Sequence, residues 1–420
     1  MRKYQGLELI SRFECGLERS ALYNKDRIRE DELAWYCVEM TNTEWLTVND
    51  LRDREPVGAP PLVTIVVVNY NYARFIEQCI RSVAAQDYRH IECLILDCAS
   101  TDGSAAVIQS TLERLGDPRF KFRRRDFNRG QLANALSAIN EINGAFVNFL
   151  DADDLLFPEF VSSHVKAHLN DLNPAAVTVS DQIQIDAAGH ALAGTCAWHQ
   201  KWRVQSLGND WPDLSHARSW LPTSHGFAKC NEVALRYVPA WWSSWPGDRW
   251  IWSTTSAMMF RSTVIARLAP GEAELEGFGR LNLDGYYARF AHSVGGTLII
   301  DAAHGAYRRH GNNVWSSNPI FGGFSAASPR DEPGQLRALQ ELARRVLVAR
   351  HGDLVPSIGG ELYYSIAWQL MSNDDFFRFA KAHEADRVHW EATIKSANVA
   401  IPSRVQLAVR HIRRRFGSRY

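Results

Sequence analysis

The sequence has little that would place it in a membrane. Its longest apolar run, around Leu62 to Val68, is far shorter than the roughly 20 residues that a helix needs to span a bilayer. The first residues, Met-Arg-Lys-Tyr-Gln, lack the continuous apolar core of a signal peptide. We therefore expect a cytoplasmic protein.

Net charge and paired cysteines are also missing. The 47 basic and 47 acidic side chains give a formal net charge of +0, so we expect no overall attraction to nucleic acid and predict no nucleic-acid partner. The seven cysteines show neither a Cys-x-x-Cys pair nor zinc-ligand spacing, which suits a reducing compartment. No Gly-x-Gly-x-x-Gly follows the first predicted strand and no Gly-Lys-Ser/Thr occurs, which excludes a Rossmann dinucleotide pocket and a P-loop.

Strand and helix patterns alternate from residue 62 to residue 179. The predicted strands are mostly continuous and apolar, as in a parallel sheet that is covered on both faces. They are Leu62–Val68, Ile91–Leu96, Phe120–Phe122, Ala145–Leu150 and Ala176–Val179. Apolar residues at helical spacing lie between them, for example Ile76, Cys79, Ile80 and Val83. Repeated strand–helix units predict an α/β fold with a mostly parallel sheet flanked by helices.

Polar side chains follow four of these strands. The segments are Asn69–Tyr72, Asp97–Ser104, Asn128–Gln131 and Asp151–Asp154. Ligands of open α/β sheets bind beyond the carboxyl ends of the strands. We therefore expect the four segments to meet at one edge of the sheet and to form one ligand site.

The segment Asp151-Ala152-Asp153-Asp154 places three carboxylates directly after an apolar strand. Carboxylates near a core are usually paired or hold a metal, and Mg²⁺ and Mn²⁺ accept oxygen ligands. Asp151 and Asp153 could both direct oxygens at one cation, with a substrate phosphate as a further ligand. The alternative is an acidic turn before a helix that begins near Pro158.

In their order and spacing, these segments resemble family 2 glycosyltransferases, which are inverting enzymes of the GT-A fold. The resemblance runs from about Leu62 to Gly189, and it resumes near Asp284 and at Tyr307 to Asn313. It implies a GT-A-type fold and transfer of a sugar from a nucleotide-diphospho-sugar to a hydroxyl acceptor. One departure is Cys98, which stands where the family usually has a second Asp.

The resemblance also implies which residues bind the donor. Tyr70 would lie against the nucleotide base with Asn69 beside it, and Asp97 would accept a hydrogen bond from the base. Asp151 would lie near the ribose. Gln131, in the segment that resembles the family's Asn-x-Gly-Gln, would belong to the same nucleotide-sugar site.

Metal binding and base catalysis are assigned in the same way. Asp153 would hold Mn²⁺ or Mg²⁺ on the diphosphate. Because an imidazole can join carboxylates around Mn²⁺, His310 is a candidate second ligand, and the alternative is a histidine that only orders a loop near the phosphates. Asp284 is the one acidic residue in the segment that matches the family's catalytic base, and its alternative role is to cap a helix over Gly285 to Ser293. Arg308 and Arg309 either pair with phosphate or face solvent.

Outside this core the sequence predicts extensions and one unusual insertion. We expect an N-terminal extension with helical character and a linker over residues 1–60, a GT-A domain over 61–325, and a helical region over 326–420. Within the domain, 61–190 would bind the nucleotide sugar and 191–325 the acceptor. Residues 190–260 contain nine of the fourteen tryptophans, which either form an acceptor platform or fill a core.

The C-terminal end carries a basic amphipathic pattern. Val405, Val409, Ile412 and Phe416 form one apolar stripe with arginines around it. Such a helix either lies on an anionic membrane surface or packs on its own protein. The first alternative predicts peripheral attachment at the inner face of the membrane.

The function predicted from the sequence is a metal-dependent inverting glycosyltransferase. The donor would be a nucleotide-diphospho-sugar and the acceptor a glycan or glycolipid, in synthesis of a cell-surface polysaccharide or glycolipid. The alternatives are a catalytically inactive GT-A-like module that binds nucleotide or serves as a scaffold, and a nucleotidyltransferase.

Overall fold

The computed structural model describes residues 60–170, 175–195, 235–238, 240, 245, 250–311, 313 and 334–386. All of these lie in one compact unit, Pro60–Tyr420. The predicted extension over 1–60, apart from Pro60, and the basic segment near residues 402–416 lie outside the described residues. They stay predictions.

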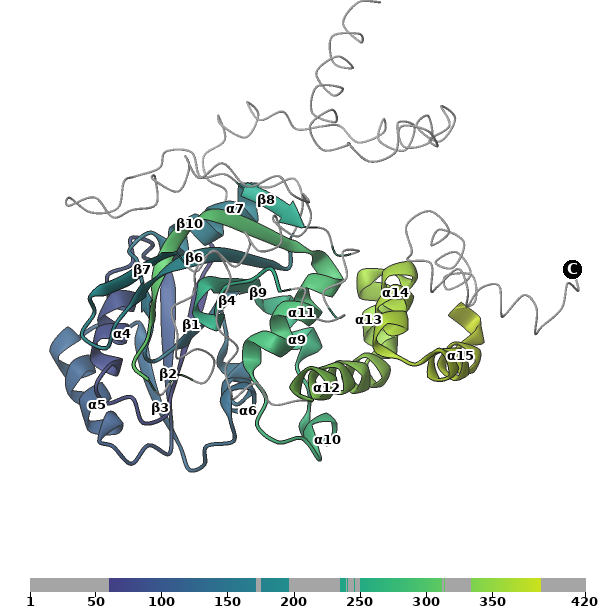
Figure 1. Cartoon of the computed structure of the whole chain (residues 1–420), viewed down its shortest axis with the longest axis horizontal. Coiled ribbons are helices and arrows are strands. Elements are labelled where there is room, and N and C mark those ends of the chain that lie inside the picture. The colour runs from purple at the N-terminus through teal and green to yellow at the C-terminus, as the bar shows by residue number, and fades with distance from the viewer. Residues whose placement is uncertain are drawn as a thin grey trace, which may run out of the picture. The chain divides into compact units, whose positions relative to one another are not determined.

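The first half of the unit is built from parallel strands joined by helices (Figure 1). The strands are β1 (Val63–Asn69), β2 (Ile91–Cys98), β3 (Phe120–Arg125) and β4 (Phe146–Asp151). The helices are α4 (Ile76–Ala84), α5 (Ser104–Leu115) and α6 (Gln131–Leu136), with a 3₁₀ turn at Ile139–Glu141. The spatial order is β3-β2-β1-β4 and every neighbouring pair is parallel. The carboxyl ends of these four strands therefore share one edge, as the sequence predicts.

The second half extends the same sheet with strands of both directions. Past β4 the order continues β9-β6-β10-β5, with β7 paired to β6 and β8 to β10. The strands are β5 (Leu155–Leu156), β6 (Val177–Ile185), β7 (Ala191–Thr195), β8 (Leu235–Val238), β9 (Met258–Arg261) and β10 (Thr297–Arg308). β10 runs parallel to β6, while β9 is antiparallel to both of its neighbours.

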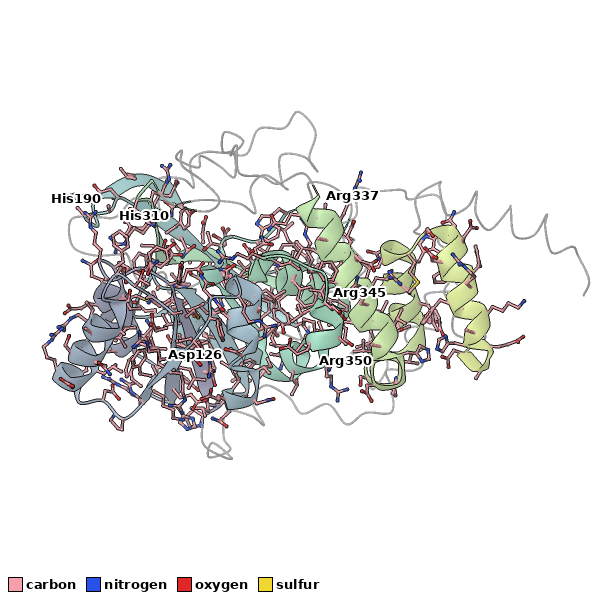
Figure 2. The ribbon with its side chains drawn as sticks, turned by 90° about the horizontal axis from the view of Figure 1, so that it is seen from below. Asp126, His190, His310, Arg337, Arg345 and Arg350 are labelled. Carbon is pink, nitrogen blue, oxygen red and sulfur yellow. The ribbon has the colours of Figure 1, made fainter. Side chains whose placement is uncertain are left out.

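Helices also accompany these strands and continue after them. They are α7 (Phe160–Asn170), α9 (Ser262–Leu268), α10 (Glu272–Leu275), α11 (Leu283–Gly295), α12 (Gln335–Ala349), α13 (His351–Ile358), α14 (Gly360–Leu370) and α15 (Asn373–Ala382), with 3₁₀ turns at Thr255–Ala257 and Glu384–Asp386. One side chain of α12 and that of its C-cap residue anchor the helix to the α9–α10 segment. Arg345 donates to the carbonyl of Glu276 at 2.8 Å, and Arg350 donates to that of Ala269 at 2.6 Å (Figure 2).

Apolar side chains are buried on both faces of the sheet, which explains why the strands read as continuous apolar runs. Val63, Ile65 and Val67 of β1 lie in one core cluster and Val66 lies in the other. The first cluster includes the four predicted α4 residues Ile76, Cys79, Ile80 and Val83. The second is larger and joins the other face to α11, α12 and α14.

The α/β fold class is thus confirmed, with helices flanking one sheet. The parallel arrangement dominates the first half, whereas the second half mixes parallel and antiparallel pairs. Helices α12 to α15 confirm the predicted helical region as far as residue 386. Among the described residues no helix is long and apolar enough to cross a membrane.

Candidate active site

The loops after β1 and β2 interlock at the carboxyl edge of the sheet. Asn71 donates its backbone N–H to Ser100 Oγ at 2.9 Å, and its Oδ1 accepts from the N–H of Thr101 at 2.8 Å. Asn71 and Ala99 are the described non-glycine residues with positive φ, 61° and 60°. Alanine has no side-chain hydrogen bond to offset a left-handed backbone, which costs about 1–2 kcal/mol. Strain of this kind concentrates at functional sites.

The residues predicted to surround the nucleotide base come together here. Asn69 Nδ2 donates to Asp97 Oδ1 at 2.8 Å and to Ser100 Oγ at 3.1 Å, and all three side chains are buried. Asp97 Oδ2 has no hydrogen-bond partner among the described residues, although Arg124 Nε lies 3.9 Å from it. Tyr70, directly after Asn69, is exposed. Asp97 thus keeps an acceptor oxygen, which is buried in this structure.

The acidic segment begins with two carboxylates that repel one another. Asp151, at the end of β4, is half-buried, and its Oδ1 accepts from Gln131 Nε2 at 2.7 Å. Burial, followed by the negative charge of Asp153, raises the pKa of Asp151 above its usual range. The same two causes raise the pKa of the nearby Tyr72 hydroxyl. A positive charge placed here would relieve this repulsion.

Asp154, in contrast, is used entirely within the fold. It is 1% exposed, its Oδ1 accepts from the backbone N–H of Arg308 at 2.9 Å, and its Oδ2 accepts from Ser256 Oγ at 2.7 Å. Both oxygens are therefore occupied by protein donors. Asp154 joins the end of β4 to the end of β10 and to the turn before β9.

Arg308 hydrogen-bonds the backbone of the acidic segment. Its side chain is fully buried, its Nε donates to the carbonyl of Asp153 at 2.8 Å, and one Nη donates to Gln78 Oε1 at 2.7 Å. Its other Nη donates to the carbonyl of Asp186 at 3.3 Å. The alternative in which Arg308 faces solvent is wrong, because its side chain is buried and donates to protein acceptors. Pairing of this arginine with phosphate stays a prediction.

His310 and Asp153 form the part of the site that fits a divalent cation. His310 Nε2 lies 2.9 Å from Asp153 Oδ2, and both side chains are largely buried. The rings of Tyr72 and Phe75 pack on His310 at centroid distances of 5.6 and 5.0 Å (Figure 2 labels His310). Among the described residues no group of three or more His, Cys, Asp or Glu side chains could hold a metal. The pair fits a cation that takes only two protein ligands and completes its shell with phosphate and water.

Asp284, the predicted base, lies in the first turn of α11, which begins at Leu283 with Asn282 as N-cap. The expected N-cap role of Asp284 is therefore wrong. Its Oδ1 accepts from the N–H of Gly285 at 2.7 Å. Burial raises its pKa to about 6. Its negative charge contributes to the raised pKa of Asp151, so the two carboxylates act on each other electrostatically.

Three of the nine tryptophans predicted as an acceptor platform are described. Trp245 and Trp252 are fully buried, and their indole N–H groups donate to Ser293 Oγ and Thr297 Oγ1, each at 3.0 Å. These two belong to the core around α11. Trp250 is half-buried and lies under the Arg289 guanidinium, 5.3 Å from the ring centroid. The other six lie outside the described residues.

No role was predicted for Tyr72 or Ser256, and one contact of Gln131 was not expected from the sequence. Tyr72 follows the predicted Asn69–Tyr70 pair but packs at the opposite, acidic end. Ser256 lies in an ordinary polar stretch, and it hydrogen-bonds both Asp154 and the backbone N–H of Asp151. Gln131 was expected from its motif, but its second contact, with Leu283, joins residues far apart in sequence.

Comparison with known proteins gives the class of this region. Residues 64–203 match the family model "Glycosyl transferase family 2", which confirms the resemblance to family 2 glycosyltransferases. An uncharacterized glycosyltransferase of Nostoc sp. PCC 7120 is 37% identical over 99 residues, 23% of this chain and 29% of that protein. Chondroitin synthase of Escherichia coli is 28% identical over 138 residues, 33% of this chain and 20% of that protein. The chain thus spans less than a third of the length of either relative.

The comparison with solved structures found S. aureus TarS, residues 1–349 in complex with UDP-GlcNAc, at 15% identity and a TM-score of 0.42 over 82% of this chain and 83% of that one.

Proposed function

We propose that this chain is an inverting glycosyltransferase that moves a sugar from a nucleotide-diphospho-sugar to a hydroxyl of a glycan or glycolipid. The reaction would serve synthesis of a cell-surface polysaccharide or glycolipid. The observation that carries the proposal is the grouping of Asp151, Asp153 and Asp284 at one edge of the sheet. Asp151 and Asp284 are joined there through Gln131 and Leu283. The match of residues 64–203 to the family model supports it.

In this proposal the donor lies across the carboxyl ends of β1, β2 and β4. The nucleotide base packs on Tyr70 and donates a hydrogen bond to Asp97, which Asn69 orients. Asp151 accepts from the ribose, and Gln131 lies beside it. Asp153 and His310 would hold Mn²⁺ or Mg²⁺, and the bound cation would neutralise charge on the leaving diphosphate.

The transfer step needs one base. Asp284 takes the proton of the acceptor hydroxyl while that oxygen attacks the anomeric carbon from the face opposite the diphosphate. Attack from that face inverts the configuration. A pKa of about 6 leaves the Asp284 carboxylate mostly ionised at neutral pH but more basic than an exposed aspartate.

The test is sugar transfer or hydrolysis with a panel of UDP-, GDP- and dTDP-sugars in the presence of Mn²⁺. Thermal shift identifies the nucleotide first, because a ligand that binds only the folded state raises its stability. Asp153→Ala should abolish Mn²⁺-dependent turnover. The matched control is Asp117→Ala, which removes a carboxylate that pairs with Arg119 before β3.

The two alternatives make different predictions in this assay. An inactive binding module would show a nucleotide-dependent thermal shift and no turnover with any sugar. A nucleotidyltransferase would form nucleotide sugars from nucleoside triphosphates instead of consuming them. Turnover retained in Asp153→Ala would contradict the proposed metal role.

Attachment of residues 402–416 to anionic membranes is part of the proposal for a glycolipid acceptor.

A further inference from the structure

Gln131 is hydrogen-bonded on both sides of its amide. It is the first residue of α6, its Nε2 donates to Asp151 Oδ1 at 2.7 Å, and its Oε1 accepts from the backbone N–H of Leu283 at 3.0 Å. A further contact of 3.4 Å joins Nε2 to Thr255 Oγ1. Little of its hydrogen-bonding capacity is left for a ligand.

The bond to Leu283 satisfies an orphan donor at the start of α11. The first N–H groups of a helix have no acceptor within that helix. The N-cap, Asn282, forms no side-chain capping hydrogen bond, so Gln131 supplies the acceptor from another element. Asp284 is the next residue, and its placement therefore depends on this bond.

The segment around Gln131 packs closely against the chain that leads into α11, which leaves the Gln131 bridge little room to shift. The backbone N–H of Leu132 donates to the carbonyl of Leu281 at 3.2 Å. Gly130 has φ +92°, and a Cβ there would lie 3.0 Å from Arg280 Cβ. The Asn-x-Gly-Gln segment thus packs directly against the chain that leads into α11.

We propose that Gln131 is a positioning residue that fixes Asp284, the base, relative to Asp151 at the donor. The inference rests on the proposed function for the roles of the two carboxylates. An amide is required because one side must donate to a carboxylate while the other accepts from an N–H. The reversed amide would place its oxygen against Asp151 and its NH₂ against an N–H, so the orientation is determined.

The chain contains a matched control, Gln86. It is 1% exposed, its Nε2 donates to the carbonyl of Phe157 at 2.8 Å, and its Oε1 accepts from the N–H of Val161 at 3.0 Å. Val161 lies in the first turn of α7, so Gln86 caps a helix from outside just as Gln131 does. None of the proposed site residues belongs to α7.

The first test is hydrogen–deuterium exchange of the full chain, without ligand and with UDP and Mn²⁺. Gln131→Leu should speed exchange of the Leu283 amide about tenfold, the effect of losing one hydrogen bond. Gln131→Glu keeps an acceptor for that amide and should leave it protected. Gln86→Leu should speed exchange at Val161 only. Unchanged exchange at Leu283 in Gln131→Leu would overturn the proposal.

The second test separates positioning from donor binding. Gln131→Leu should lower kcat about 100-fold, the effect of a misplaced catalytic group, with the donor KM changed less than about threefold. Gln131→Glu should also lower kcat because it sets a second carboxylate against Asp151, and Gln86→Leu should change neither constant.

Two results would contradict the positioning role of Gln131, and a third concerns only the proposed glycosyl transfer. A raised donor KM with unchanged kcat would make Gln131 a donor contact. Equal losses in Gln131→Leu and Gln86→Leu would make it a general stability residue. If the wild-type protein turns over no nucleotide sugar, the proposed reaction fails, while exchange at Leu283 still decides whether Gln131 holds α11.

Discussion

Replacing Asp284 by Asn should raise the stability of the protein while removing its activity. Asn keeps the shape of the side chain and an oxygen that can accept from the Gly285 N–H. With Asp284 this hydrogen bond measures 2.7 Å. It removes a negative charge that burial disfavours, the first cause of the raised pKa of Asp284. The two effects are opposite in sign because a catalytic base is chosen for reactivity and not for stability.

The stability gain follows from the pKa of about 6, against 3.8 for an unperturbed Asp. A raised folded-state pKa means that the stabilising contribution of the proton is complete below pH 3.8 and is lost as pH rises to about 6. The loss at neutral pH is at most about 3 kcal/mol, at 1.36 kcal/mol per pKa unit. The Asp284 carboxylate also interacts favourably with the first turn of α11. Losing this interaction offsets up to about 1 kcal/mol of the stability gained with Asn. We expect a net gain of about 1–2 kcal/mol at pH 7 and none at pH 3.5.

The activity loss has its own pH signature. At saturating donor and Mn²⁺, kcat of the wild-type protein should fall about tenfold from pH 7 to pH 5, as the base takes up its proton. Asp284→Asn should lower kcat by about 10²–10⁴ and should remove this acidic limb. Donor affinity should stay within a few fold, because in the proposed reaction Asp284 acts on the acceptor.

The measurements are urea unfolding at pH 3.5 and pH 7 together with the pH profile of kcat. A variant that loses stability at pH 7 as well as activity would show that Asp284 is a structural residue. A variant that keeps the wild-type acidic limb would show that another group, such as Asp151, is the base.

Three further predictions concern stability. Gly130→Ala should lower the free energy of unfolding by about 1–3 kcal/mol, because φ is +92° and the new methyl meets Arg280; urea unfolding measures it. Arg308→Met should cost about 3–5 kcal/mol and weaken the Mn²⁺-dependent thermal shift by UDP, and Arg308→Lys should not restore it, because one ammonium cannot replace the planar fork. Burial lowers the pKa of His168 to about 3, so its stabilising contribution is complete above pH 6.5 and is lost at about 1.4 kcal/mol per pH unit as pH falls; His168→Gln should flatten this slope in urea titrations.

The strands whose carboxyl ends carry the candidate site could be predicted because their apolar runs are buried on both faces. β1, β2 and β4 each lie within one or two residues of their predicted bounds. β6 was predicted only over Ala176–Val179, yet it continues to Ile185. Its second half contains Asp181, Gln182 and Gln184, which are polar and nevertheless buried. Pairing with β10 sets that part of the strand, and hydrophobic pattern does not reveal it.

The candidate site likewise has a part that the sequence predicts and a part that only tertiary contacts reveal. Side chains at strand ends, such as Asp97 and Asp151, could be placed from the order of the strands alone. Their partners could not, because Ser256 and Arg308 reach the acidic segment from about 100 and 150 residues further along the chain. Such contacts depend on the packing of β9 and β10 against β4 and β6.

These partners decide which of the three neighbouring aspartates can meet a ligand. Asp154 gives both oxygens to Arg308 and Ser256, so it works as a joint between strands. Asp151 gives one oxygen to Gln131, and Asp153 faces His310. Removing Asp154 should therefore unfold this edge of the sheet, whereas removing Asp153 should leave the fold intact and abolish metal binding at the proposed site. The three aspartates look alike in the sequence. Only their tertiary contacts show which one stabilises the fold and which ones can meet a ligand.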